Sequence, residues 1–196
     1  MTKIILMGIV AYMIGNISPA YILTKKTAHK DIREHGSGNA GSTNVLRVVG
    51  KKAALITFIV DVLKGVLASA LGYHVGGRDL ALISAFLVVF GHVFPVVLKF
   101  KGGKGVATSL GAMSVLHPMF VLISLLLGVA TILRTKYVSL GSMVGGCSLT
   151  LVLLAARSDM KSIWVALLMG AFICYTHREN IKRLLNGEER RLGEKA

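Results

Sequence analysis

Apolar runs follow one another along almost the whole chain, and short polar segments separate them. Most runs approach the roughly 20 residues that a helix needs to cross a hydrocarbon core about 30 Å thick. They predict an all-α, polytopic membrane protein of about seven transmembrane helices. The predicted helices are Ile4–Leu23, Ala53–Tyr73, Leu80–Leu98, Gly105–Leu116, Met119–Leu133, Tyr137–Ala156 and Ser162–Thr176. We expect them to form a single integral-membrane domain over residues 1–196.

The short fourth run, Gly105–Leu116, could instead be a re-entrant or interfacial segment. The placement of charge tests this, because Lys and Arg near span ends gather on the cytoplasmic side. With seven spans and the N-terminus outside, only four of the 23 Lys and Arg residues would face outward, namely Lys3, Arg78, Arg157 and Lys161. Without the fourth span, the two sides would carry nearly equal numbers. We therefore predict seven spans and a cytoplasmic C-terminus.

Composition supports this class of protein. Hydrophobic residues make up 54% of the chain and charged residues 16%, and the mean hydropathy is +0.68. The net charge of +14 lies mainly in the short connections, which favours anionic lipid and anionic substrates over nucleic acid as partners. Cys147 and Cys174 lie inside apolar runs, where they are expected to be small packing residues rather than a disulfide or metal ligands.

The first predicted cytoplasmic connection, Thr24–Lys52, contains the glycine-rich stretch Gly36–Asn44, which Arg47 follows. Its glycine spacing matches a dinucleotide-binding fingerprint, but the polar residues 30–35 before it do not form the buried strand that this fingerprint requires. The glycines still let backbone N–H groups approach an anion, and Arg47 offers a forked donor for phosphate. We predict an oxyanion-binding loop, with a flexible polar turn as the alternative.

A second basic turn lies between the third and fourth predicted spans. Gly102, Gly103 and Gly105 surround Lys104 directly before a predicted helix, where backbone N–H groups and the helix dipole favour an anion. The residue order is not that of a Walker loop. His92 lies within the preceding span, and such a histidine is either a functional residue or a structural one whose hydrogen bonds are satisfied.

Other polar residues lie within the spans or at their predicted cytoplasmic ends. Ser139 and Ser142 stand among glycines that helix packing alone would explain. His177 leads into a basic tail, which would otherwise be an amphipathic helix lying on lipid. Asp61 and Lys64 are three residues apart in the second span, and we expect a buried structural pair.

The loop Gly36–Arg47, the segment Gly91–Thr108 and the tail His177-Arg178-Glu179-Asn180 together resemble one family. It is the bacterial membrane-integral acyl-phosphate:glycerol-3-phosphate acyltransferase family of the PlsY type, and the resemblance covers the whole chain. It implies transfer of a fatty acyl group from acyl phosphate to the 1-hydroxyl of glycerol 3-phosphate. The products would be lysophosphatidate and inorganic phosphate, in the first step of bacterial phospholipid synthesis.

The resemblance also implies a location, partners and site residues. The protein would be a multi-pass protein of the bacterial cytoplasmic (inner) membrane with its active site on the cytoplasmic side. Its partners would be acyl phosphate, glycerol 3-phosphate and membrane lipid, without cofactor, metal or nucleic acid. An upstream enzyme that forms acyl phosphate is a candidate partner, and the oligomeric state stays open. We assign substrate binding to Ser37, Gly38, Asn39, Gly41, Thr43, Asn44, Arg47, His92, Gly102, Gly103 and Lys104, and catalysis to Lys104, Ser142, His177 and Asn180.

An acyl phosphate is already activated, so the protein needs mainly to supply proximity and charge stabilisation. The sequence offers no convincing nucleophile–base set, and we expect direct attack without an acyl-enzyme. The proton acceptor is either His177 or an oxygen of the substrate's own phosphate, and we favour the phosphate. The main alternative function is a transporter of phosphate or a phosphorylated metabolite, which should have broken helices at mid-membrane and a polar path to the outside.

Overall fold

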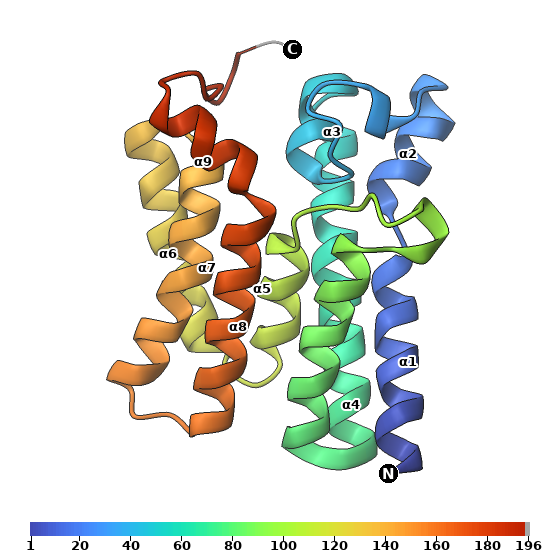
Figure 1. Cartoon of the computed structure of the whole chain (residues 1–196), viewed down its shortest axis with the longest axis vertical. Helices are drawn as coiled ribbons and strands as arrows, with labels where there is room; N and C mark the ends of the chain where they lie inside the picture. Colours follow the sequence, from blue (N-terminus) through green and yellow to red (C-terminus); the bar gives the residue numbers. More distant parts are fainter. Residues whose placement is uncertain (195–196) are drawn as a thin grey trace. The chain divides into compact units, whose positions relative to one another are not determined.

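The structure is a computed structural model that describes residues 1–194, and every regular element in that range is helical (Figure 1). It contains two compact units, Met1–Leu116 and His117–Glu194, which are described separately below. The helices of the first unit are α1 (Thr2–Asn16), α2 (Pro19–Ala28), η1 (Ile32–Glu34), α3 (Ser42–Val48), α4 (Lys51–Val93), η2 (Val96–Leu98) and α5 (Val106–Ser114). Those of the second are α6 (Pro118–Thr135), α7 (Val138–Ala155), α8 (Met160–Thr176) and α9 (Arg178–Leu185).

The first predicted span, Ile4–Leu23, is wrong as a continuous helix. It is broken at residues 17–18, between α1 and α2. Pro19 disfavours helical geometry at Ser18, and the Ser18 hydroxyl accepts a hydrogen bond from the Tyr21 N–H at 3.4 Å as the N-cap of α2. The break leaves carbonyl oxygens at the end of α1 without partners inside the helix.

Helix α4 turns back on itself at Gly76 and Gly77, whose backbone angles are not helical (Figure 1). Gly77 has a φ of 69°, in the left-handed region that glycine adopts without strain. The two arms pack closely enough for the Ser69 hydroxyl to donate to the Ala81 carbonyl at 3.4 Å. A straight helix of this length would reach about 65 Å, twice the thickness of a hydrocarbon core. The hairpin arms correspond to the second and third predicted spans.

The third predicted span ends earlier than expected. Its helix stops at Val93 rather than at Leu98, because Pro95 disfavours helical geometry in the residue before it. The chain then passes through η2 into the second basic turn. The predicted loop Thr24–Lys52 also holds more structure than expected, since it includes the end of α2, η1 and α3.

In the second unit, α6 packs on α7 and α7 packs on α8. Glycines allow the close approach: a Cβ on Gly141 would overlap the Gly128 carbonyl of α6. Between α7 and α8, the Sγ atoms of Cys147 and Cys174 lie 3.4 Å apart, and both cysteines are free thiols. Helix α9 leaves α8 at a bend of 61°.

Within residues 1–194, four helical segments could cross a membrane by length and composition: Thr2–Ala28, Lys51–Leu98, Pro118–Thr135 and Val138–Ala155. A fifth is added if α8 and α9 are counted as one bent span. The all-helical, membrane-spanning architecture therefore agrees with the sequence. Seven crossings, with α5 as the short fourth one, remain a prediction, as does the placement of the two termini.

Candidate functional site

The glycine-rich loop of the first unit is organised by the buried side chain of Asn44. Its Oδ1 accepts the Ser37 N–H at 2.9 Å. Its Nδ2 lies within 3.1 Å of three backbone carbonyl oxygens, those of Ile32, His35 and Asn39. Asn44, predicted to bind substrate, thus directs its amide into the loop. The geometry favours a positioning role for it.

Asn44 also explains why the loop needs glycine at its start. Gly36 has a φ of 64°, and a Cβ there would overlap Asn44 Oδ1. Gly38 has a φ of 69°, again in the left-handed region. Ser37 and Gly38 are exposed at the tip of the loop, so the Ser37 hydroxyl and the Gly38 backbone lie at the surface of the unit.

The second basic turn is hydrogen-bonded to this loop. The Ala40 N–H donates to the Gly102 carbonyl at 3.3 Å, and the Asn39 amide donates to the same oxygen at 3.4 Å. The second basic turn is also hydrogen-bonded to the end of α4, where the Gly103 N–H donates to the His92 carbonyl at 3.1 Å. The two glycine-rich stretches that the sequence singled out therefore form one continuous surface of the first unit.

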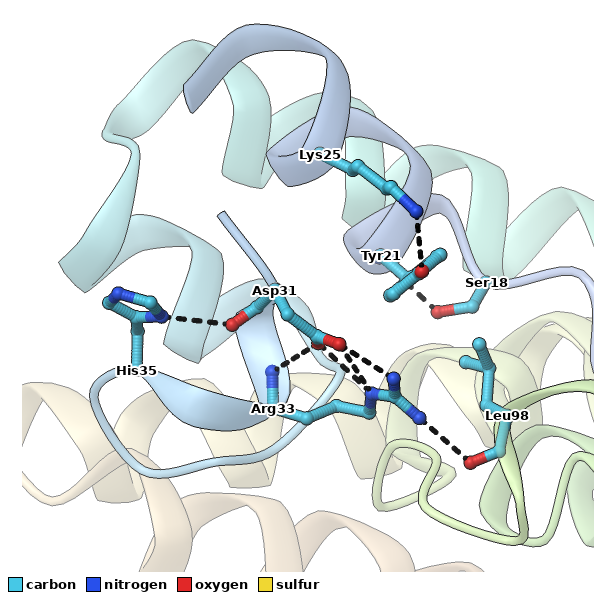
Figure 2. Close-up of polar contacts among 7 residues, drawn as sticks. All are labelled: Ser18, Tyr21, Lys25, Asp31, Arg33, His35 and Leu98. Carbon is cyan, nitrogen blue, oxygen red and sulfur yellow. Dashed lines mark hydrogen bonds and ion pairs between the residues drawn. The ribbon is translucent and has the colours of Figure 1, made fainter. Parts of the chain in front are cut away.

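Arg33 links η1, which precedes the glycine-rich loop, to the end of η2, which precedes the second basic turn (Figure 2). Its guanidinium pairs with the Asp31 carboxylate, at 2.6 Å between Nη2 and Oδ2, and donates through Nη1 to the Leu98 carbonyl at 3.0 Å. It also lies over the Tyr21 ring, 5.1 Å from the ring centroid. The hydrogen bond from Arg33 lowers the pKa of the Asp31 carboxyl, although burial opposes this. Asp31 therefore stays ionised at neutral pH.

The residues around this pair are also hydrogen-bonded (Figure 2). His35 Nδ1 lies 2.9 Å from the Asp31 carbonyl, which can only accept, so the ring hydrogen sits on Nδ1. The Lys25 ammonium donates to the Tyr21 hydroxyl at 3.1 Å. Sequence reasoning missed the Asp31–Arg33 ion pair. An acidic and a basic residue two positions apart, just before the glycine-rich loop, are a signal that could have indicated it.

Two cations are placed near this surface by short elements. Arg47 is in the last turn of α3, five residues after its first residue, Ser42, and Lys104 directly precedes Gly105, the N-cap of α5. Both side chains are half-buried and both have interaction partners. Thr43 lies in the first turn of α3. Exposed N–H and hydroxyl groups with cations close by in the sequence can bind oxyanions.

His92, the other predicted binding residue of this unit, lies below the turn in a buried cluster of charged groups. Its Nδ1 is 2.7 Å from Lys64 Nζ and 3.3 Å from Asp61 Oδ1. Lys64 and Asp61 pair at 2.8 Å, so the predicted buried pair is confirmed. His92 is only 6% exposed, and its ring contacts protein groups. The geometry again favours positioning over direct contact with substrate.

In the second unit, a buried carboxylate joins three elements. Glu189 Oε1 accepts from the Ser139 hydroxyl at 2.7 Å and from the Asn180 amide at 2.6 Å, and Oε2 accepts from Arg183 Nε at 2.8 Å. Burial opposes ionisation, but these hydrogen bonds outweigh it and lower the pKa of Glu189. The cluster ties the tail to the start of α7 and to α9. Glu189 was not assigned to the site from sequence.

The remaining predicted catalytic residues belong to the same unit. His177 is buried at the junction of α8 and α9, and its Nδ1 donates to the Ile173 carbonyl at 2.8 Å. That bond fixes the hydrogen on Nδ1 in the neutral ring, so Nε2 carries the lone pair. Ser142 lies on α7 three residues after Ser139 and is half-buried. Asn180 uses its amide on Glu189, which fixes the orientation of its side chain.

Comparison with known proteins gives one consistent result. The family model described as glycerol-3-phosphate acyltransferase matches residues 5–187. The glycerol-3-phosphate acyltransferase of Thermoanaerobacter pseudethanolicus is 51% identical over 97% of this chain and 96% of its own. One from Thermus thermophilus is 44% identical, over 100% and 98%. The crystal structure of PlsY, an integral membrane glycerol 3-phosphate acyltransferase, in its glycerol 3-phosphate form has a TM-score of 0.92 and 38% identity, covering 97% of this chain and 96% of that one. Its lysophosphatidic acid form has a TM-score of 0.89 and 36% identity, over 97% and 95%.

Proposed function

This chain belongs to the glycerol-3-phosphate acyltransferase family, and we propose that it transfers a fatty acyl group from an acyl phosphate to the 1-hydroxyl of glycerol 3-phosphate. The observation that carries the proposal is the joined pair of glycine-rich turns in the first unit, with Arg47 in the helix that follows the first and Lys104 within the second. Both substrates carry a phosphate, so the reaction requires two anion sites. The products are lysophosphatidate and inorganic phosphate.

In the proposed reaction, the 1-hydroxyl oxygen attacks the carbonyl carbon of the acyl phosphate. A new ester C–O bond forms, the C–O bond to phosphate breaks, and inorganic phosphate leaves with the electron pair. Arg47 and Lys104 neutralise the phosphate charges, and the Ser37 hydroxyl and loop N–H groups donate to phosphate oxygens. Because the leaving group is good, the chain needs no nucleophile of its own, and no acyl-enzyme forms.

Ser142, His177 and Asn180 of the second unit orient the attacking hydroxyl in this proposal. The proton passes to an oxygen of the phosphate, or to Nε2 of His177. We favour the phosphate because His177 Nδ1–H donates to a neutral carbonyl, whereas a carboxylate acceptor in that place would raise the basicity of the ring. Residues of both units are thus assigned to one reaction, and we treat 1–196 as one functional domain.

We further propose seven crossings of a bacterial inner membrane. The glycine-rich loop, the second basic turn and the C-terminal tail would lie in the cytoplasm. The strong bias of Lys and Arg toward one side supports this placement. A membrane-impermeant thiol reagent would test it on single-cysteine variants at residues 101 and 188 of a Cys147→Ser/Cys174→Ser chain. Labelling of these two positions from opposite sides of the bilayer would refute the topology and with it the proposed site.

The activity is tested directly by phosphate release. Purified protein is mixed with palmitoyl phosphate and glycerol 3-phosphate, and palmitoyl-CoA replaces the acyl phosphate as the control donor. We expect lysophosphatidate and phosphate in equal amounts from acyl phosphate and no product from the CoA ester. Activity with acyl-CoA alone would refute the proposed donor.

The roles of the residues are tested with Arg47→Ala, Lys104→Ala and His177→Ala. We expect the first two to lose at least 100-fold in kcat/KM, or about 2.7 kcal/mol of transition-state stabilisation. His177→Ala should retain more activity if the phosphate accepts the proton. Normal turnover by the first two variants would refute the assignment, and a burst of radioactive acyl label on the protein would refute direct attack.

A further inference from the structure

We propose that Lys64 is a positioning residue, which holds the second basic turn in place through its contact with His92. The proposal rests on the proposed function, because it assigns Lys64 a part in placing the phosphate-binding turn. Lys64 itself lies within α4, with its side chain only 4% exposed, and it does not reach the surface that the turns form.

The Lys64 ammonium joins three separate parts of the first unit. It donates to the Gly15 carbonyl at 3.1 Å and to the Ile17 carbonyl at 2.7 Å, both at the broken end of α1. These oxygens lack partners inside the helix because the chain breaks before Pro19. A cation also suits the negative end of the α1 dipole. Lys64 therefore stabilises the break in α1 as well as pairing with Asp61.

The remaining partner, His92, connects Lys64 to the second basic turn. His92 Nδ1 lies 2.7 Å from the Lys64 ammonium and 3.3 Å from Asp61 Oδ1, so this edge of the ring is held between the two charged groups. The Nε2 side of the ring faces Gly103, where an added Cβ would overlap Nε2. The His92 carbonyl accepts the Gly103 N–H at 3.1 Å. His92 thus contacts the residue directly before Lys104 through both its ring and its backbone.

The same chain of contacts continues into the glycine loop. Gly102, which precedes Gly103, donates its N–H to the Val93 carbonyl and accepts through its own carbonyl from Ala40 and Asn39. A shift of the His92 ring would therefore move both glycine-rich stretches together. Since catalysis by proximity is sensitive to displacements of about 1 Å, an ordered Lys64–His92 contact has a direct consequence for rate.

The test removes the link without leaving a buried charge. Lys64→Met alone leaves the buried Asp61 carboxylate without its lysine and is expected to reduce the yield of folded protein. The double variant Asp61→Asn/Lys64→Met removes both charges and keeps similar side-chain volumes. Ser69→Ala is the matched control, because Ser69 is buried on the same arm of α4 and bonds to Ala81 rather than to the turn.

Two measurements are made on purified protein in nanodiscs: hydrogen exchange of peptides that cover Gly102 and Gly103, and steady-state kinetics. In the double variant we expect exchange of these two amides to accelerate at least tenfold relative to α6 and α7 peptides, and kcat/KM to fall at least tenfold. Both quantities should stay within twofold in Ser69→Ala. A double variant that folds with normal exchange at the turn, or one that exchanges faster evenly along the chain, would overturn the proposal.

The exchange result does not depend on which reaction the protein catalyses. If wild-type protein fails to release phosphate from acyl phosphate, the proposed function falls, while local exchange at the turn still decides whether Lys64 holds it. If wild type is active and the double variant is active at the wild-type rate, the function stands and the positioning role is wrong.

Discussion

Replacing Asn44 by aspartate should loosen the glycine-rich loop while changing almost nothing in side-chain size. The carboxylate keeps an acceptor for the Ser37 N–H, which lies 2.9 Å from Oδ1 in the wild type. It replaces the NH₂ group, which faces three carbonyl oxygens at 2.9 to 3.1 Å, by an oxygen. Three favourable contacts become repulsive ones, and the buried carbonyls lose their donor.

The magnitude follows from these contacts. A hydrogen bond of this kind contributes a net ~0.5–1.5 kcal/mol, and the two N–H groups of the amide are shared among the three oxygens, so their loss costs about 2 kcal/mol before repulsion is counted. At about 1.4 kcal/mol for each factor of ten, the loop should open roughly 30 times more often. Because Ser37 and Gly38 belong to this loop, activity should fall with it.

Hydrogen exchange of a peptide covering residues 35–44 measures the opening, and phosphate release measures the activity. Asn186→Asp makes the same chemical change at an exposed asparagine in the second unit and should leave both measurements at wild-type values. If Asn44→Asp abolishes turnover while loop exchange stays within threefold of wild type, Asn44 acts on substrate directly. The positioning role argued above would then be wrong.

Three further predictions concern other contacts. The hydrogen bonds that lower the pKa of Glu189 stabilise the docked tail above its ordinary pKa of 4.5, and this stabilisation is lost as the pH falls through the lower folded-state value. Arg190 and Arg191 are exposed in the docked tail, and Glu189→Gln should release the tail and speed trypsin cleavage at both at neutral pH. An unchanged cleavage rate would contradict the docking contact. Gly103→Ala should lower kcat/KM at least tenfold, because the added Cβ would overlap the His92 ring. Gly187→Ala, which has open space around it, is the control. It should lower the free energy of unfolding by at most the ~1–2 kcal/mol of left-handed strain and leave turnover unchanged. Mild oxidation should join Cys147 to Cys174 within one chain, seen as the loss of two alkylatable thiols; two thiols that stay alkylatable would refute the 3.4 Å contact.

The sequence alone determined the class of the protein and the location of most helices. Helix α7 (Val138–Ala155) lies within a residue of each end of its predicted span, and α8 ends at Thr176 as expected. These features depend on apolar run length and on nearby turn residues, which are local properties of the chain. The glycine-rich stretches could also be recognised, because glycine and basic residues close together in sequence suffice to indicate an anion-binding turn.

Only the tertiary structure decided what the polar side chains within these segments do. Lys64 contacts the Gly15 carbonyl 49 positions away, and Arg33 contacts the Leu98 carbonyl 65 positions away. Sequence reasoning could pair Lys64 with Asp61, three residues along the helix, but it could not find the broken end of α1. Nor could it show that the Asn44 amide bonds back to its own loop or that His92 lies against Lys64. A buried polar group takes whichever partner the packing brings within about 3 Å, and that partner is set by the approach of distant segments.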